Sequence, residues 1–344
     1  MNTTSRINQT LQGLLLAAIS FVALAPAHAQ NDIEVTAQNY VRAESDLQMT
    51  GYIAVQDNFG KFKHNREPWD VESRVTVRPN RDTLYSIGVF DLSSPLTINL
   101  PDPEGRYQSL MAISQDHSIG SIYGPSEVTL TEERVGTRYV MLVVRTFMDP
   151  NDEQDVKATH QLQDAVVTKQ ADIGTYDVPS WSKEEVEQMR ETINVVTSTV
   201  TDTSKMFGKK EDLDPVYWLL GAAFGWGGLP AEAAMYTNVV PEKNDGMIPH
   251  TLTVKDVPVD AFWSITLYDG EGWMPINEYN AYSFNSVTAK TDNDGSITIH
   301  FGGDPKQANF LPIVPEWNYI VRLYRPRQEI LSGEWTFPSP EPVR

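Results

Sequence analysis

Residues 77–86 read VRPNRDTLYS and place two arginines, an asparagine, an aspartate and a tyrosine within ten positions. The stretch lies between a strand-like run over residues 71–77 and another over residues 84–92. Burying so many polar groups costs free energy unless they pair with one another or hold a ligand. The stretch is therefore either a structural turn, closed by a salt bridge between Arg81 and Asp82, or part of a ligand-binding site.

The composition narrows the class of protein. The chain of 344 residues contains no cysteine, which excludes disulfides and thiol chemistry. Its net charge of −19 argues against nucleic acid as a partner. Residues 1–29 combine Arg6, an apolar run and the end Ala27-His28-Ala29, which is the pattern of a secretory signal peptide. We therefore expect an exported protein, periplasmic or secreted, with no transmembrane segment after cleavage.

The rest of the chain divides into three parts. Short runs rich in β-branched and aromatic residues, separated by turn formers, recur over residues 30–150 and again over 236–344. Between them, residues 151–235 are polar or glycine-rich and favour helix; Ser182 and Glu185 form a capping box that predicts a helix over residues 183–197. The predicted fold is mainly β with a helical insert (α+β), in which short strands at this spacing form a sandwich or a barrel.

Two polar groups at strand ends are candidates for catalysis. One is the stretch 77–86, with Arg81, Asp82 and Tyr85; the other is His117, which ends the run Gln115-Asp116-His117 just after an apolar strand. A rigid strand end is a place where a fold can position functional groups. In this hypothesis Arg81 holds a negative oxygen, His117 moves a proton and Asp82 orients one of them.

Longer motifs resemble a known pair of bacterial domains. The runs NYVRAE (39–44), HNREP (64–68), NRDTLYS (80–86) and QDH (115–117) are similar to the domain of unknown function 1254. The runs GWGGLP (225–230), FWSITLY (262–268), NAYS (280–283) and NYIVRLYRP (318–326) are similar to the domain of unknown function 1214. The resemblance covers nearly all of the chain after residue 29. It implies two β-barrel or jelly-roll-like domains joined by a helical segment, in exported proteins that can form homo-oligomers.

Activity is less well defined by this resemblance. Some members are labelled carboxylesterases, without an agreed catalytic set, and Phe310 stands where we expect a cysteine in many relatives. The leading hypothesis is a carboxylesterase-like hydrolase acting on a small organic substrate, with Arg81, Asp82, Tyr85 and His117 at the reacting group. The residues expected to bind the substrate are Asn80, Gln115, Trp226, Tyr282 and His300.

Two alternatives stay open. The first is a non-catalytic periplasmic binding or assembly protein, in which the polar motifs fix the domain junction and the aromatic residues build a core or a subunit contact. The second is a metal-dependent enzyme that uses His117 and His300 together with carboxylates. The histidines do not follow the spacing of a zinc site, so a metal ion stays an option only within this alternative and no other cofactor is predicted.

Overall fold

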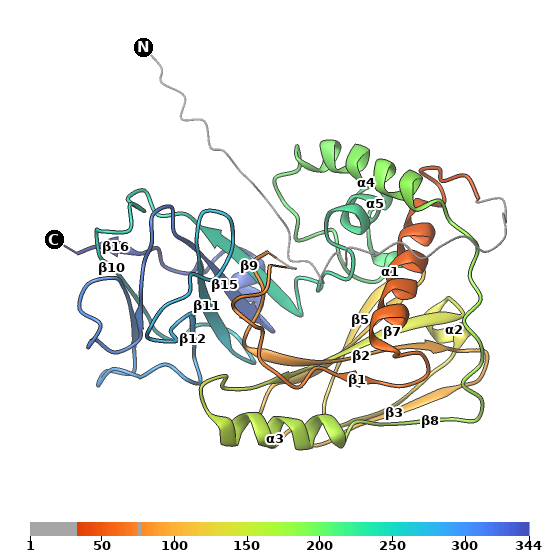
Figure 1. The fold of residues 1–344 in the computed structure, drawn as a ribbon, viewed down its shortest axis with the longest axis horizontal. Helices are drawn as coiled ribbons and strands as arrows, with labels where there is room; N and C mark the ends of the chain where they lie inside the picture. Colours follow the sequence, from red (N-terminus) through yellow and green to blue (C-terminus); the bar gives the residue numbers. More distant parts are fainter. Residues whose placement is uncertain (1–32, 75–76, 344) are drawn as a thin grey trace, which may run out of the picture.

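The structure is a computed structural model that describes residues 33–74 and 77–343, so the signal peptide predicted over 1–29 lies outside the described residues. Figure 1 shows two β regions side by side, with helices covering one face of the first region's sheet. Strands outweigh helices, which confirms the prediction of a mainly β fold with a helical insert. Among the described residues, no helix is both long enough and apolar enough to cross a membrane.

The first domain contains two antiparallel sheets that share one core. The larger sheet has the strand order β1 (Lys63–His64), β2 (Thr83–Asp91), β7 (Tyr139–Phe147), β4 (Gln108–Ser114) and β5 (Ile119–Tyr123). The smaller sheet has the order β6 (Ser126–Leu130), β3 (Leu96–Leu100) and β8 (Val167–Gln170). Side chains alternate between the faces of a strand, so Leu110, Leu142 and Val144 point toward Ile98 and Val128 of the smaller sheet.

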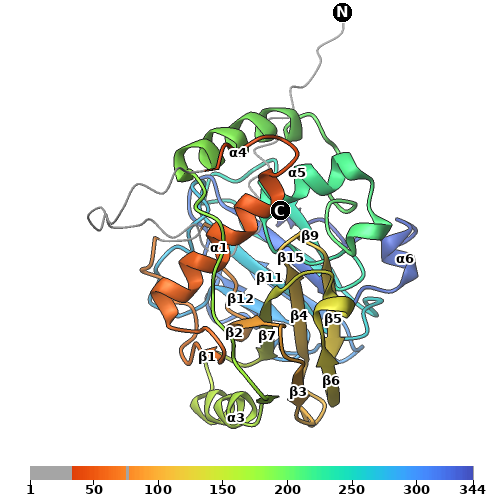
Figure 2. The same cartoon turned by 90° about the vertical axis from the view of Figure 1, so that its right-hand side faces the viewer.

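Helices cover the opposite face of the larger sheet. The helices of the described residues are α1 (Tyr40–Gln56), α2 (Glu132–Val135), α3 (Glu153–Asp164), α4 (Lys183–Thr197), α5 (Pro215–Gly225), α6 (Gln328–Leu331) and a short 3₁₀ turn (Lys210–Asp212). Of these, α1 lies directly on this face, α4 and α5 pack on α1, and α6 packs on the core of the second domain. Met49 and Tyr52 of α1 pack on this face of the sheet, whereas Val41 of α1 packs on α4 and α5. Figure 2 shows α1 crossing in front of the sheet, with α4 above it and α3 below.

The second domain is also built from two sheets. One has the order β12 (Ser283–Asn285), β11 (Trp263–Tyr268), β15 (Asn318–Tyr324) and β9 (Ala234–Val239); the other has the order β14 (Phe310–Leu311), β13 (Ile297–Phe301), β10 (His250–Val254) and β16 (Glu341–Pro342). Their shared core contains Leu252, Ile265, Ile299 and Val321. None of the four sheets closes into a barrel within the part of the chain that the structure describes.

Most predicted elements are present, and one is not. The helix predicted over 183–197 is α4, and its cap is real, because the Ser182 hydroxyl accepts a hydrogen bond from the Glu185 amide (3.3 Å). The strand predicted over 71–77 is wrong, since residues 71–74 form a turn and a loop. Val71 is apolar there because it packs against the second domain, which is a tertiary contact and not a strand face.

Candidate functional site

The stretch 77–86 joins the two domains. Arg322 of β15 donates hydrogen bonds to the backbone carbonyls of Arg78 (3.1 Å) and Pro79 (3.3 Å), and to the Tyr268 hydroxyl (2.7 Å). Tyr268 in turn donates to the Pro79 carbonyl (2.7 Å). The chain just before β2 is therefore fixed against the sheet of the second domain, as the alternative of a junction motif anticipated.

Asp82 is buried within this junction. It is 1% exposed, and its carboxylate accepts a hydrogen bond from the Ser264 hydroxyl (2.6 Å) of β11. Burial raises the pKa of Asp82 above its usual range, although the positive charge of Arg322 and the bond from Ser264 oppose the shift. The carboxylate of Asp82 therefore contacts the second domain and is not exposed to an open cavity.

Arg81 and Tyr282 lie together, as two of the residues predicted for the site. The Arg81 guanidinium lies 5.4 Å from the centre of the Tyr282 ring and donates to the Trp69 carbonyl (2.6 Å). Arg81 does not form the predicted salt bridge with Asp82 among the ion pairs of the described residues. Both side chains are buried, so this contact holds the loop that precedes β2.

A second group of predicted residues lies beneath the helices. Gln115 donates to the Asp46 carboxylate (2.6 Å) and accepts from the Tyr139 amide (3.1 Å). His117 packs beside Trp226, with ring centres 5.9 Å apart, and its Nε2 accepts a hydrogen bond from the Gly227 amide (2.9 Å). These contacts link the end of β4 to α1 and to the chain after α5.

The strand register separates these two groups. Thr83, which follows Asp82, pairs with Phe147 on β7, whereas Ser114, three residues before His117, pairs with Val140 on the same strand. Those partners are seven residues apart along β7, which corresponds to roughly 23 Å. Arg81 and Asp82 are therefore at one end of the sheet and His117 at the other. The structure does not bring the four predicted catalytic residues to one reacting group.

His300 lies in a third place. It belongs to β13 of the second domain, where it points away from the core as predicted, and its Nδ1 lies 2.8 Å from the Ala308 carbonyl oxygen. His117 and His300 are thus in different domains and do not form a joint metal site. Across residues 33–74 and 77–343, no three histidine, aspartate or glutamate side chains are grouped so as to hold a metal ion.

Tyr85 belongs to a different group, which the sequence did not reveal. It pairs across strands with Arg145 of β7, Arg145 pairs with Ser109 of β4, and Ser109 pairs with Tyr123 of β5. The four side chains form one row across the sheet, on the same face as α1, where Phe262 and Tyr324 of the second domain also pack. Tyr107 adjoins this row by donating a hydrogen bond to Ser109 (3.0 Å).

Arg145 is the unusual member of the row. It is 6% exposed, and no carboxylate among the described residues forms an ion pair with it. Its guanidinium donates to the Met111 sulfur (3.7 Å), a weak acceptor, and lies 5.4 Å from the centre of the Tyr85 ring. A buried cation without an anionic partner is costly unless something supplies the negative charge.

Tyrosines supply the rest of its surroundings. Burial opposes the charge of Arg145, yet the hydroxyls of Tyr85, Tyr236 and Tyr107 together raise its pKa. Burial likewise opposes the ionisation of Tyr85, but Arg145 and hydrogen bonds from neighbouring side chains outweigh it and lower the pKa of Tyr85. By contrast, burial raises the pKa of Tyr236 to about 12. Arg145 therefore favours a negative charge on Tyr85 in particular.

Asn80 connects this group to the junction stretch. Its side-chain amide donates to the Tyr324 hydroxyl (2.9 Å) and lies within 3.4 Å of the Tyr85 hydroxyl. Tyr324 comes from β15 of the second domain, where its ring stacks on Phe262 with centres 4.2 Å apart. The candidate site is therefore made of Asn80, Tyr85 and Arg145 from the first domain and aromatic residues from the second.

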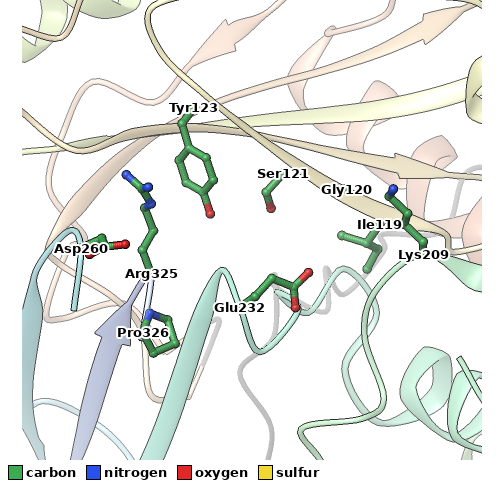
Figure 3. A pocket seen from close by; sticks show the side chains of 9 residues that line it. All are labelled: Ile119, Gly120, Ser121, Tyr123, Lys209, Glu232, Asp260, Arg325 and Pro326. Atoms are coloured by element: carbon green, nitrogen blue, oxygen red, sulfur yellow. The ribbon is translucent and has the colours of Figure 1, made fainter. Parts of the chain in front are cut away.

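Two hollows open at the outer end of the row. They have volumes of about 520 Å³ and about 350 Å³, and Tyr123, Asp260 and Arg325 line both. The larger one is also lined by Tyr107, which donates to Ser109 of the row, and by Phe262, whose ring centre lies 5.5 Å from that of Tyr107. Figure 3 shows the smaller hollow, where the Arg325 guanidinium lies beside the Tyr123 ring (4.7 Å). The row thus leads from a buried cation to the domain boundary.

Fold and site together define a protein of two β-sandwich domains, with a buried arginine and tyrosine group where the domains meet. Residues 59–119 match the family described as protein of unknown function DUF1254, and residues 234–328 match protein of unknown function DUF1214. The chain therefore carries these two domains in this order, which confirms the resemblance of its motifs.

A solved structure shares the fold. The crystal structure of VPA0106 from Vibrio parahaemolyticus matches with a TM-score of 0.66 at 20% sequence identity, over 90% of this chain and 98% of that one. An uncharacterised protein from Burkholderia cenocepacia matches with a TM-score of 0.48 at 14% identity, over 90% of this chain and 89% of that one. No curated protein matches the chain. At such identities the likeness concerns the fold alone.

Proposed function

We propose that the protein binds a small organic anion between its two β domains, with Arg145 as the counter-ion. The observation that carries this proposal is the buried guanidinium, which has no carboxylate partner within residues 33–74 and 77–343. Five N–H donors in a planar fork suit a carboxylate, a phenolate or an enolate, and burial strengthens the attraction to any of them. The aromatic rings of Tyr107, Phe262 and Tyr324 favour a ligand with a flat, apolar body.

The proposal predicts the effect of Arg145→Met on anion binding. Wild-type protein is titrated calorimetrically with sodium benzoate at pH 7, and the variant is expected to bind at least about 30-fold more weakly because the charge-assisted bonds are lost. Arg134→Met is the matched control, since Arg134 lies exposed in α2 and its guanidinium donates to the Thr129 carbonyl (2.9 Å). Equal benzoate affinity in wild type and Arg145→Met would remove the proposal.

The substitution should not act through loss of folding. Methionine has a similar length, and replacing a poorly paired buried charge with an apolar side chain is often neutral or stabilising. The thermal midpoint of ligand-free Arg145→Met is therefore expected to equal or exceed that of the wild type. A loss of benzoate binding then reports on the site itself.

Hydrolysis of a small ester is a second candidate function, favoured by the same guanidinium. A buried cation can stabilise the negative oxygen that develops when an ester carbonyl is attacked. His117 would have no part in this step, because it lies at the other end of the sheet. With p-nitrophenyl acetate as the substrate, Arg145→Met should lose turnover and Arg134→Met should keep it; turnover retained in both variants would argue against this function.

We also propose that the protein is exported. The support is the signal-peptide pattern of residues 1–29, in which Arg6 precedes an apolar run and a small-residue cleavage site. Amino-terminal sequencing of the protein expressed in a bacterium should then begin near Gln30. A chain that retains residues 1–29 and stays in the cytoplasm would contradict export.

A further inference from the structure

Tyr85 and Arg145 form a pair whose charges depend on each other. They are opposite one another on β2 and β7, with the guanidinium 5.4 Å from the ring centre. No carboxylate among the described residues pairs with Arg145, and the ionisable groups that act most strongly on its charge are the hydroxyls of tyrosines, Tyr85 first. Arg145 can therefore be neutralised by a phenolate of the protein or by a bound anion, and two negative charges at one buried cation would repel each other.

The surroundings single out Tyr85 among these tyrosines. The Asn80 amide lies within 3.4 Å of its hydroxyl, and Thr83 and Arg145 also lower its pKa. The other titratable side chains that face it are Tyr52 from α1, Tyr236 from β9 and Tyr324 from β15, and burial raises the pKa of all three. Tyr85 is thus the hydroxyl of this group that gives up its proton first.

We infer that Tyr85 is the proton acceptor of the site, and that the natural ligand is a weak oxygen acid, a phenol or an enol, bound as its conjugate base at Arg145. This inference rests on the proposed anion site. In the step, the O–H bond of the ligand breaks, an O–H bond forms at the Tyr85 oxygen, and the electron pair stays on the ligand. The net charge of the site is the same before and after, because one phenolate or enolate replaces another beside the guanidinium.

The class of ligand follows from the acidity of Tyr85, whose phenolate Arg145 stabilises. Since this cation favours the phenolate of Tyr85, a ligand hydroxyl of comparable acidity exchanges its proton at little cost in free energy. A carboxylic acid is already ionised near neutral pH, so it brings no proton and requires Tyr85 to be neutral. Phenols and carboxylates should therefore bind with opposite dependences on pH.

The test measures affinity against pH for two probes, phenol and sodium benzoate. In wild type, benzoate affinity is expected to fall about tenfold per pH unit once Tyr85 ionises, below pH 10, because phenolate and benzoate compete for Arg145. Phenol affinity is expected to level off over the same range, since Tyr85 takes up the proton. In Tyr85→Phe, benzoate affinity should become independent of pH there, whereas phenol affinity should keep rising toward the pKa of phenol itself.

A control and a direct readout accompany this test. Tyr279→Phe removes the hydroxyl of an exposed tyrosine of the second domain and should keep both wild-type profiles. The ultraviolet absorbance of tyrosinate should show one tyrosine of the wild type titrating below pH 10, and saturating benzoate should move that titration to higher pH. Identical pH profiles in wild type and Tyr85→Phe would overturn the role of Tyr85. Binding that ignores Arg145→Met would instead overturn the anion site itself.

Discussion

Replacing Arg322 by methionine should lower the free energy of unfolding by about 3–5 kcal/mol, because it leaves several buried acceptors without a donor and a buried carboxylate without its positive neighbour. Arg322 is fully buried and donates to the Thr266 hydroxyl (2.8 Å), to the Tyr268 hydroxyl and to two carbonyls of the junction stretch. Its loss would leave the carboxylate of Asp82 without its main positive neighbour. Urea unfolding at pH 7 measures the effect.

Two comparisons make this prediction specific. Arg327→Met removes an exposed arginine that pairs with Asp260, and its urea midpoint should equal that of the wild type. The double variant Arg322→Met with Asp82→Asn should be less destabilised than the sum of the single variants, because the two residues interact. A loss of less than about 1 kcal/mol in Arg322→Met would mean that another contact holds the domains together.

The two buried arginines differ in what surrounds them. Arg322 has hydroxyls and carbonyls placed to accept its donors, whereas Arg145 has a sulfur atom and tyrosine rings. Both lie in strands that otherwise read as apolar, Tyr139–Phe147 and Asn318–Tyr324. A single arginine inside an apolar strand is the sequence signal that could have pointed to both, but it does not tell a structural role from a binding role.

Local patterns were sufficient for much of the fold. The helix over residues 183–197 follows from its cap and its spacing of apolar residues, and the polar stretch 77–86 was recognised as a candidate junction or site. The grouping of the catalytic residues depended on how strands distant in the sequence pair, and this prediction was wrong. β2 and β4 both run antiparallel to β7, so the start of β2 and the end of β4 lie at opposite ends of that strand, and nothing within either strand specifies this pairing. His117 and Asp82 were therefore grouped although the fold separates them.

The position of His117 at the end of a strand also did not predict that its side chain is buried. The ring is 1% exposed and packs against Trp226 and Phe207 (6.2 Å between ring centres), which come from the region between the two β domains. Those contacts depend on how the helical segment folds back over the sheet. His117 is consequently a buried acceptor for the Gly227 amide, and its main consequence concerns stability at low pH.

His117 should make the protein sensitive to acid. Burial lowers the pKa of His117 to about 3, from 6.5 for a free side chain. Between pH 6.5 and pH 3, therefore, the unfolded chain binds a proton at His117 and the folded protein does not. The stability contributed by the neutral ring is present above pH 6.5 and is lost as the pH falls. The expected slope is about 1.4 kcal/mol per pH unit between these two values.

Urea unfolding of wild type and His117→Gln at pH 7, 6, 5 and 4 tests this expectation. Glutamine can accept the hydrogen bond from Gly227 but carries no titrating ring, so the variant should be less stable than the wild type at pH 7 and approach it as the pH falls. Phe207→Leu is the matched control, because it removes packing from the same contact without removing a proton site. Its difference from the wild type should stay constant with pH, whereas parallel curves for wild type and His117→Gln would show that His117 is not the residue that sets the acid response.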